Sequence, residues 1–142
     1  MIDPKENVRE GRDRYLAASG FTMDSYTDPN FVIRVGFLKL RFKNPGLLPF
    51  HDLHHVATGY DSGLMGEAEI SAFELRAGWG TPLIFVLCCG SILMAMFVSP
   101  GRLWSAWKRA RGAKSLYGTK TKYETLLAMN VGELRKLMEL EG

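Results

Sequence analysis

The sequence predicts a mainly α fold, a single all-helical domain over residues 1–142 with a small β-hairpin near Phe31 to Phe42. Most of the chain divides into helix-length stretches, in several of which apolar residues recur at helical spacing. Glycine, proline and asparagine separate these stretches, as they do at helix ends and turns. A chain of 142 residues is long enough for one hydrophobic core but not for two independent ones.

The first third of the chain predicts one helix and then the hairpin. Asn7 to Ser19 carries apolar residues among charges and ends at Gly20, which is typical of a short amphipathic helix. After a polar turn, residues 31–42 alternate around Gly36, which favours a β-hairpin, although a helix over residues 38–41 is an alternative. Asn44-Pro45-Gly46 then breaks the chain.

Two antiparallel helices are predicted next, joined by the turn from Thr58 to Gly63. The first contains His51-Asp52-Leu53-His54-His55, and the second runs from Leu64 to Ala77. Gly66 leaves room for a close approach of the backbone at the start of the second helix.

An apolar stretch without a charged residue extends from Thr81 to Val98. A bilayer core needs about 20 apolar residues for a helical span, and Pro82 and Gly90 weaken a span further. We expect a buried or lipid-lining helix, with a membrane span and an interfacial helix as alternatives.

The last third predicts a basic helix from Leu103 to Leu116, a turn at Tyr117-Gly118-Thr119, and two short helices at residues 122–129 and 131–140. Asn130 and Glu133 have the spacing of a capping box at the start of the last helix.

The net charge of +3 is small, but the charges are unevenly distributed. No acidic residue occurs between Glu74 and Glu124. The same stretch contains eight cations: Arg76, Arg102, Lys108, Arg109, Arg111, Lys114, Lys120 and Lys122. Because they accompany Trp104, Trp107 and an apolar segment, and no nucleic-acid-binding motif is present, we expect a membrane surface rather than nucleic acid as the partner.

The compartment is expected to be the cytoplasm. Cys88 and Cys89 are adjacent in the apolar stretch, where they act as small apolar residues rather than as a disulfide framework. The N-terminal residues resemble neither a secretory signal nor an organelle transit peptide.

A divalent metal site is predicted around His51, Asp52, His55 and Glu67. On a helix with about 3.6 residues per turn, His51 and His55 share a face with Asp52 beside them, and the next helix returns Glu67 to them. Two imidazoles with carboxylates suit zinc best, with iron, manganese or cobalt as alternatives. Asp52 is either a fourth ligand or a partner that accepts a ring N–H, and Glu67 and Asp52 are the expected catalytic carboxylates.

Two neighbours of this motif, His54 and Glu74, are not among the expected metal ligands. His54 points away from the other two histidines and is expected to be a surface or packing residue. Glu74 lies on the same helical face as Glu67, so it is an acid that supports the site, a general base or a solvated glutamate. A simple amphipathic helix with a solvated polar face would also explain the histidine pair.

The spacing His51-Asp52-x-x-His55, eleven residues, then Glu67 resembles the signature of the coenzyme Q biosynthesis protein four family. The flanking Leu48-Pro49-Phe50, Gly66-Glu67 and Tyr123 to Leu127 segments are similar to that family too, so the likeness extends in outline from Asn44 to Leu140.

The resemblance implies a helical, peripherally membrane-bound protein of ubiquinone or related prenyl-quinone biosynthesis, at the inner face of the membrane. It implies that a prenylated aromatic lipid is bound and that ring C1 of a polyprenyl hydroxybenzoate is oxidatively decarboxylated with metal assistance. Other quinone-biosynthesis proteins are expected partners, and a homo-oligomer is expected because the apolar helix is long for one small core.

Three alternatives remain. A non-catalytic prenyl-lipid-binding scaffold with a structural metal would fill four protein ligands, whereas an enzyme would leave a coordination position open. A small single-span protein would use Thr81 to Val98 as its anchor. A zinc protease is disfavoured because Asp52 is one methylene shorter than the usual glutamate base.

Overall fold

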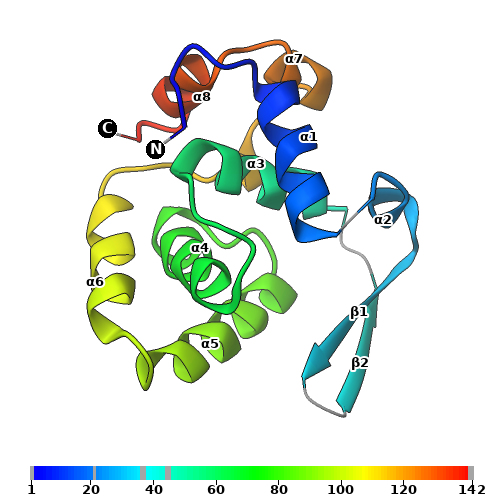
Figure 1. The fold of residues 1–142 in the computed structure, drawn as a ribbon, viewed down its shortest axis with the longest axis vertical. Helices are drawn as coiled ribbons and strands as arrows, with labels where there is room; N and C mark the ends of the chain where they lie inside the picture. Colours follow the sequence, from blue (N-terminus) through cyan, green and yellow to red (C-terminus); the bar gives the residue numbers. More distant parts are fainter. Residues whose placement is uncertain (1, 21, 36–37, 44–45, 141–142) are drawn as a thin grey trace.

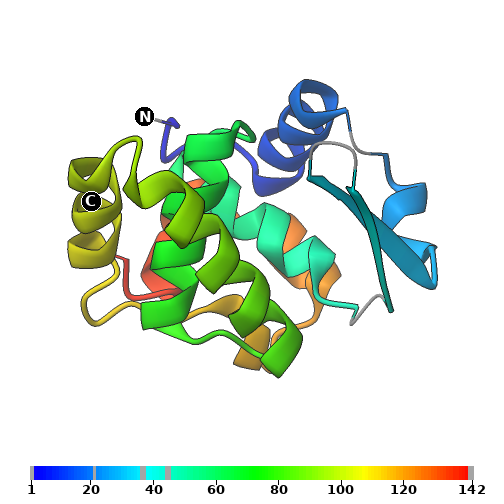
Figure 2. The ribbon, with the colours of Figure 1, turned by 90° about the horizontal axis from the view of Figure 1, so that it is seen from below.

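Helix α4 (Leu64–Ala77) lies at the centre of the computed structural model, which describes residues 2–20, 22–35, 38–43 and 46–140. Three helices surround it: α3 (Leu48–Thr58), α5 (Pro82–Met96) and α6 (Pro100–Arg109) (Figure 1). The predicted mainly helical single domain is confirmed. Figure 2 shows α4 between α3 and α5 from a second direction.

Helix α1 (Val8–Ser19) packs against α3 and confirms the first predicted helix. The Asn7 side chain accepts a hydrogen bond from the Arg9 amide, and Gly20 ends the helix with a φ of 75°. A Cβ on Gly11 would lie 2.8 Å from Cγ1 of Val56, so this glycine allows α1 to approach α3 closely.

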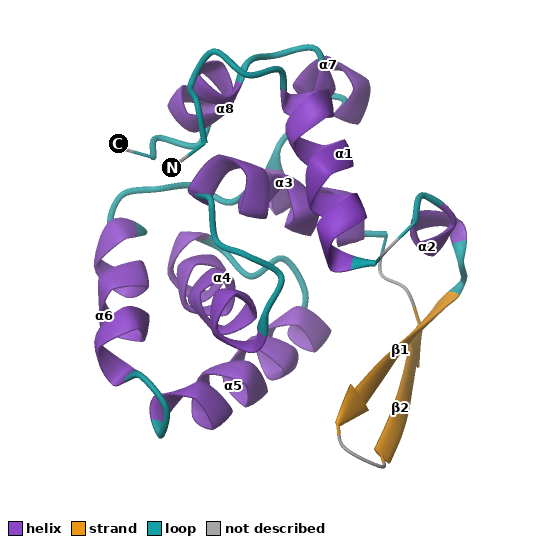
Figure 3. Ribbon diagram, in the orientation of Figure 1, coloured by secondary structure: helices purple, strands orange, loops and turns teal. Residues whose placement is uncertain are grey.

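The β-hairpin is also confirmed, and the alternative helix is wrong. Strands β1 (Asn30–Val35) and β2 (Leu38–Lys43) pair antiparallel, with Phe31 opposite Phe42. The hairpin projects from the helical body (Figures 1 and 3). The polar turn before it contains a short helix, α2 (Asp24–Thr27), which the sequence did not predict. The predicted turn residue Gly36 and the break at Asn44-Pro45 lie outside the described residues.

The turn between α3 and α4 has the predicted form. Gly59 adopts a φ of 79° and donates its N–H to the carbonyl of His55 at 2.7 Å. A Cβ on Gly66 would lie 2.0 Å from the Asp61 carbonyl oxygen, so glycine is required there. This close return places the first turn of α4 beside the middle of α3.

Helix α5 occupies most of the predicted apolar stretch but is largely exposed. Its buried residues are Ile84, Cys88 and Ala95. At about 1.5 Å per residue, fifteen residues extend about 22 Å, which is shorter than a bilayer core of about 30 Å. Within the described ranges, no helix combines the length and apolar character that a bilayer crossing requires. Of the two expected forms of this helix, the buried one is therefore wrong, and the lipid-lining one stays a prediction.

The predicted basic helix begins earlier and ends earlier than expected. Helix α6 starts at Pro100, where a proline suits the first turn, and stops at Arg109. The extension to Leu116 is wrong because Gly112 adopts a φ of 82° and the chain turns there. A 3-10 turn, η1 (Leu116–Gly118), follows.

Two short helices complete the fold, α7 (Tyr123–Leu127) and α8 (Val131–Leu137). The capping box between Asn130 and Glu133 is present as predicted. The N-terminal segment lies along the connection between α7 and α8, because Val131 N–H donates to Glu6 O and Gly132 N–H donates to Pro4 O.

Two groups of buried apolar side chains hold these elements together. The larger group joins α1, α3, α4, α7, α8 and the segment after α6, and includes Leu53, Ile70, Phe73 and Leu126. The smaller group consists mainly of alanines, Ala68, Ala72, Ala95 and Ala106, and lets α4, α5 and α6 pack closely. Helix α4 contributes to both groups and is therefore fixed on several sides.

Candidate metal centre

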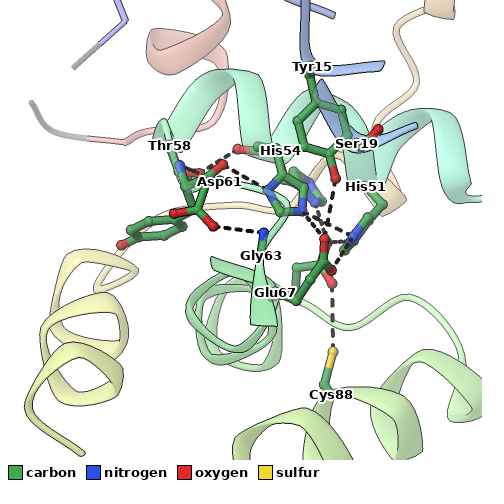
Figure 4. A network of polar contacts seen from close by, with 12 residues as sticks. Tyr15, Ser19, His51, His54, Thr58, Asp61, Gly63, Glu67 and Cys88 are labelled. Atoms are coloured by element: carbon green, nitrogen blue, oxygen red, sulfur yellow. Dashed lines mark hydrogen bonds and ion pairs between the residues drawn. The ribbon is translucent and has the colours of Figure 1, made fainter. Parts of the chain in front are cut away.

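Three of the four predicted metal ligands come together where α3 faces the start of α4. The Nε2 atoms of His51 and His55 are 3.3 Å apart. The carboxylate of Glu67 places one oxygen 3.4 Å from His51 Nε2 and the other 3.4 Å from His55 Nε2. Figure 4 shows Tyr15, His51 and Glu67 converging on this point.

These separations suit a metal ion with nitrogen and oxygen ligands. For tetrahedral zinc with bonds of about 2.0 to 2.1 Å, two ligand atoms stand about 3.3 to 3.4 Å apart. One donor atom from each of His51, His55 and Glu67 lies within 4.8 Å of the other two. The donor set therefore fits a borderline divalent cation both in chemistry and in spacing.

The orientation of His55 is determined by the turn that follows α3. Its Nδ1 lies 3.0 Å from the backbone carbonyl of Tyr60. A carbonyl only accepts, so Nδ1 carries the proton and Nε2 presents its lone pair to the site. The ring of Tyr15 stacks on His55 with 4.6 Å between the ring centroids, which restricts rotation of the imidazole.

Glu67 is the most accessible of the three ligands, with 34% of its side chain exposed. The hydroxyl of Tyr15 donates to its carboxylate at 3.3 Å. Burial disfavours the charged carboxylate, but hydrogen bonds from His51 and His55 outweigh burial and lower the pKa of Glu67 to about 2. The ligand is therefore ionised at neutral pH and open to solvent on one side.

Asp52 lies beside the three ligands rather than among them. Its Oδ2 accepts a hydrogen bond from the hydroxyl of Tyr26 at 2.5 Å. Because Nδ1 of His55 faces the Tyr60 carbonyl, that position is not available for Asp52. Burial raises the pKa of Asp52, against the hydrogen bond from Tyr26 and the charges of the histidines.

Glu74 and His54 form a buried polar group behind the three ligands. Glu74 is 1% exposed, so a solvated glutamate is excluded, and His54 is fully buried as a packing residue. Oε1 of Glu74 lies 2.9 Å from His51 Nδ1 and 2.7 Å from His54 Nδ1. The Tyr117 hydroxyl donates to the same oxygen at 2.7 Å. One imidazole, His51, thus lies between the two α4 carboxylates, Glu67 and Glu74.

The charges of this group favour a cation. Burial disfavours ionisation of Glu74, but the charge of His51 and the hydrogen bonds from His51 and His54 outweigh burial and hold the pKa of Glu74 well below its ordinary value. Burial likewise opposes the charged form of His51, yet Glu74 and Glu67 raise its pKa well above the ordinary value. Burial lowers the pKa of His54 despite Glu74, so His54 is neutral. A proton on His51 therefore occupies the position that a metal ion would take.

Two arginines hold the C-terminal end of α3 in place. Arg109 donates to the Thr58 carbonyl at 2.7 Å, and Arg135 donates to the Ala57 carbonyl at 2.7 Å. Cations at the last carbonyls of a helix satisfy those groups and complement the helix dipole. They therefore support the turn whose Tyr60 carbonyl orients His55.

No family model and no curated protein matches the chain. The candidate metal centre rests on its own geometry. Sequence reasoning predicted the grouping of His51, His55 and Glu67, which the structure brings together, but it missed the contacts of Tyr15, Tyr26 and Tyr117. Only the return of distant segments to α3 brings these tyrosines to the site, and no local pattern marks them.

Proposed function

We propose that the chain binds a divalent metal ion, zinc first among the candidates, through His51, His55 and Glu67. The observation that carries this proposal is the close grouping of the donor atoms: the two Nε2 atoms are 3.3 Å apart, and each lies 3.4 Å from one oxygen of the Glu67 carboxylate. When bound, the ion would supply Lewis-acid chemistry, polarising a coordinated oxygen of the substrate.

A catalytic role is favoured over a structural one. Structural zinc sites have four protein ligands, whereas catalytic sites have three and an open position. Among the described residues, the group that can hold a metal consists of three side chains, and Asp52 is engaged by Tyr26. The solvent-exposed side of Glu67 would admit a substrate oxygen.

The resemblance of the motif to the coenzyme Q biosynthesis protein four family supports an aromatic acid with a prenyl tail as the substrate. We propose that the protein acts in ubiquinone or related prenyl-quinone biosynthesis on ring C1 of a polyprenyl hydroxybenzoate. The bond from C1 to the carboxyl group breaks and releases carbon dioxide, a bond from C1 to a water oxygen forms to give the hydroxyl group, and two protons and two electrons are released. This is a two-electron oxidation, so an external oxidant such as dioxygen is required.

The exposed apolar side chains of α5 and its flanks support a lipid surface as the place of action. They are Trp79, Phe85, Val86, Leu93, Met94, Met96, Phe97, Val98 and Trp104. Helix α5 and the turn into α6 lie along one outer side of the molecule (Figures 1 and 2). The exposed cations Lys108 and Arg111 lie four and seven residues after Trp104 and would favour anionic lipid head groups. A non-catalytic prenyl-lipid scaffold is the second candidate that this surface supports.

Elemental analysis of the purified chain tests the metal proposal. Wild type, His55→Ala and Glu67→Ala are compared, with Glu69→Gln as the control on the same helix, because Glu69 pairs with Arg102 away from the ligands. We expect near-stoichiometric metal in wild type and in Glu69→Gln, and loss from the other two. A folded wild type that takes up no added zinc, iron, manganese or cobalt would contradict the proposal.

Incubation of the metal-loaded protein with a prenylated hydroxybenzoate, an oxidant and lipid vesicles tests the reaction. Release of carbon dioxide that requires His55 and Glu67 supports the enzyme. Stoichiometric metal and retained prenyl lipid without turnover support the scaffold instead.

A further inference from the structure

We propose that Glu74 is the positioning residue of this centre: its carboxylate fixes the ring and tautomer of His51 and thereby sets the metal affinity. The inference rests on the proposed metal binding. It assigns a role to a buried group that would touch neither the ion nor the substrate.

The contacts of Glu74 determine which nitrogen of His51 is available. Oε1 of Glu74 already accepts hydrogen bonds from the Tyr117 hydroxyl and from His54, so it is also the acceptor for His51, whose Nδ1 at 2.9 Å carries the proton. Nε2, which faces His55 and Glu67, is then the nitrogen that would give up its proton and present its lone pair to a metal ion. If Nε2 carried the only proton, His51 could not act as a ligand on that side.

Glu74 is itself held rigidly. The backbone N–H of Leu116 donates to His54 Nε2 at 2.8 Å, so neutral His54 donates to Glu74 through Nδ1. The hydroxyl of Tyr117 donates to the same carboxylate oxygen, and the Cys88 thiol lies 3.7 Å from the other oxygen. Contacts from α3, α5 and η1 thus fix a side chain of α4, and rotation of the carboxylate would break several of them.

The two ligand histidines are oriented by different kinds of partner. His55 donates to a neutral backbone carbonyl, whereas His51 donates to a negatively charged carboxylate. A carboxylate behind a ligand histidine increases the basicity of the coordinating nitrogen, and its loss typically weakens metal binding about 10- to 100-fold. The affinity of His51 for a metal ion therefore depends on Glu74, which would not itself contact the ion.

The test compares Glu74→Gln with Glu69→Gln in the full-length chain. Both changes remove the charge of a glutamate on α4 while keeping its shape, but Glu69 contacts Arg102 rather than a histidine. Zinc dissociation constants are measured by competition with a chromophoric chelator, and the Co²⁺ absorption spectrum reports the ligand set. We expect Glu74→Gln to weaken zinc binding about 10- to 100-fold, and Glu69→Gln to leave it unchanged.

The outcomes separate the two proposals. Unchanged zinc affinity in a folded Glu74→Gln overturns the role of Glu74 and leaves metal binding intact. Absence of zinc and Co²⁺ binding in wild type overturns both proposals. If Glu74→Gln does not fold, nitrogen-15 spectra of zinc-loaded wild type decide: zinc on Nε2 with a protected Nδ1 proton on His51 supports the proposal, and zinc on Nδ1 overturns it.

Discussion

Two regions of the molecule reverse the usual distribution of polar residues outside and apolar residues inside. The centre between α3 and α4 buries ionisable side chains, whereas the surface along α5 exposes apolar ones. In the centre, Glu74 and His54 are buried with their hydrogen bonds made, although burial of ionisable groups opposes folding. On the surface, Phe97 is 91% exposed although water disfavours it. The centre is therefore preorganised by hydrogen bonds within the chain, whereas the described residues make no such contacts with the exposed surface.

The largest effect is expected from breaking the centre. Glu74→Ala would leave the donors of His51, His54 and Tyr117 buried without their acceptor, and loss of one partner in such a group costs about 3–5 kcal/mol of unfolding free energy. Urea denaturation of the metal-free protein measures this. Glu69→Ala, which breaks an ion pair with Arg102, should cost much less. Equal losses would show that the centre is not specially preorganised.

Metal binding should stabilise the centre by a smaller amount. Free zinc at about one hundred times its dissociation constant adds about 2.7 kcal/mol to the unfolding free energy by mass action. Thermal or urea unfolding with and without zinc measures the gain in wild type. The gain should vanish in His55→Ala, and a gain that persists there would place the zinc elsewhere in the molecule.

The metal-free centre should also respond to pH. The pKa of His51 is raised in the folded protein, so the folded state binds the proton more tightly than the unfolded state does. Stability from this group is fully present below its ordinary pKa of 6.5 and is lost as pH rises through the folded value. Unfolding curves from pH 6 upward, with His51→Ala as the comparison, measure this loss. Stability that rose through the same range only in wild type would contradict the assignment.

The smallest effect on stability is expected on the apolar surface. Phe97→Ser should change the unfolding free energy by no more than about 0.5 kcal/mol, because its side chain is almost fully exposed. Binding to anionic vesicles should nevertheless fall, as measured by flotation. Leu137→Ser, on α8 at the opposite end of the molecule, is the matched control (Figure 1). A large loss of stability in Phe97→Ser would show that α5 belongs to the core.

Much of the fold followed from local sequence, because caps and periodicity act over a few residues. Asn7 and Gly20 mark the ends of α1, and the predicted bounds of α4 match those found. The predictions were wrong where a helix end depended on one backbone angle, or where the burial of a helix depended on tertiary contacts. Helix α6 stops before Gly112, and α5 is exposed because no described element covers its outer face.

The residues that could bind a metal can be predicted from the sequence, since the spacing of His51 and His55 on one helix and the tight turn at Gly59 and Gly66 are local properties. The contacts that hold these side chains in place come from the packing of distant segments. Tyr15, Tyr26 and Tyr117 reach the centre from distant parts of the chain, and Asp52 is directed to Tyr26 instead of the other ligands. Such contacts depend on how whole helices pack against one another. Because that packing is set by residues throughout the chain, no local sequence pattern predicts it.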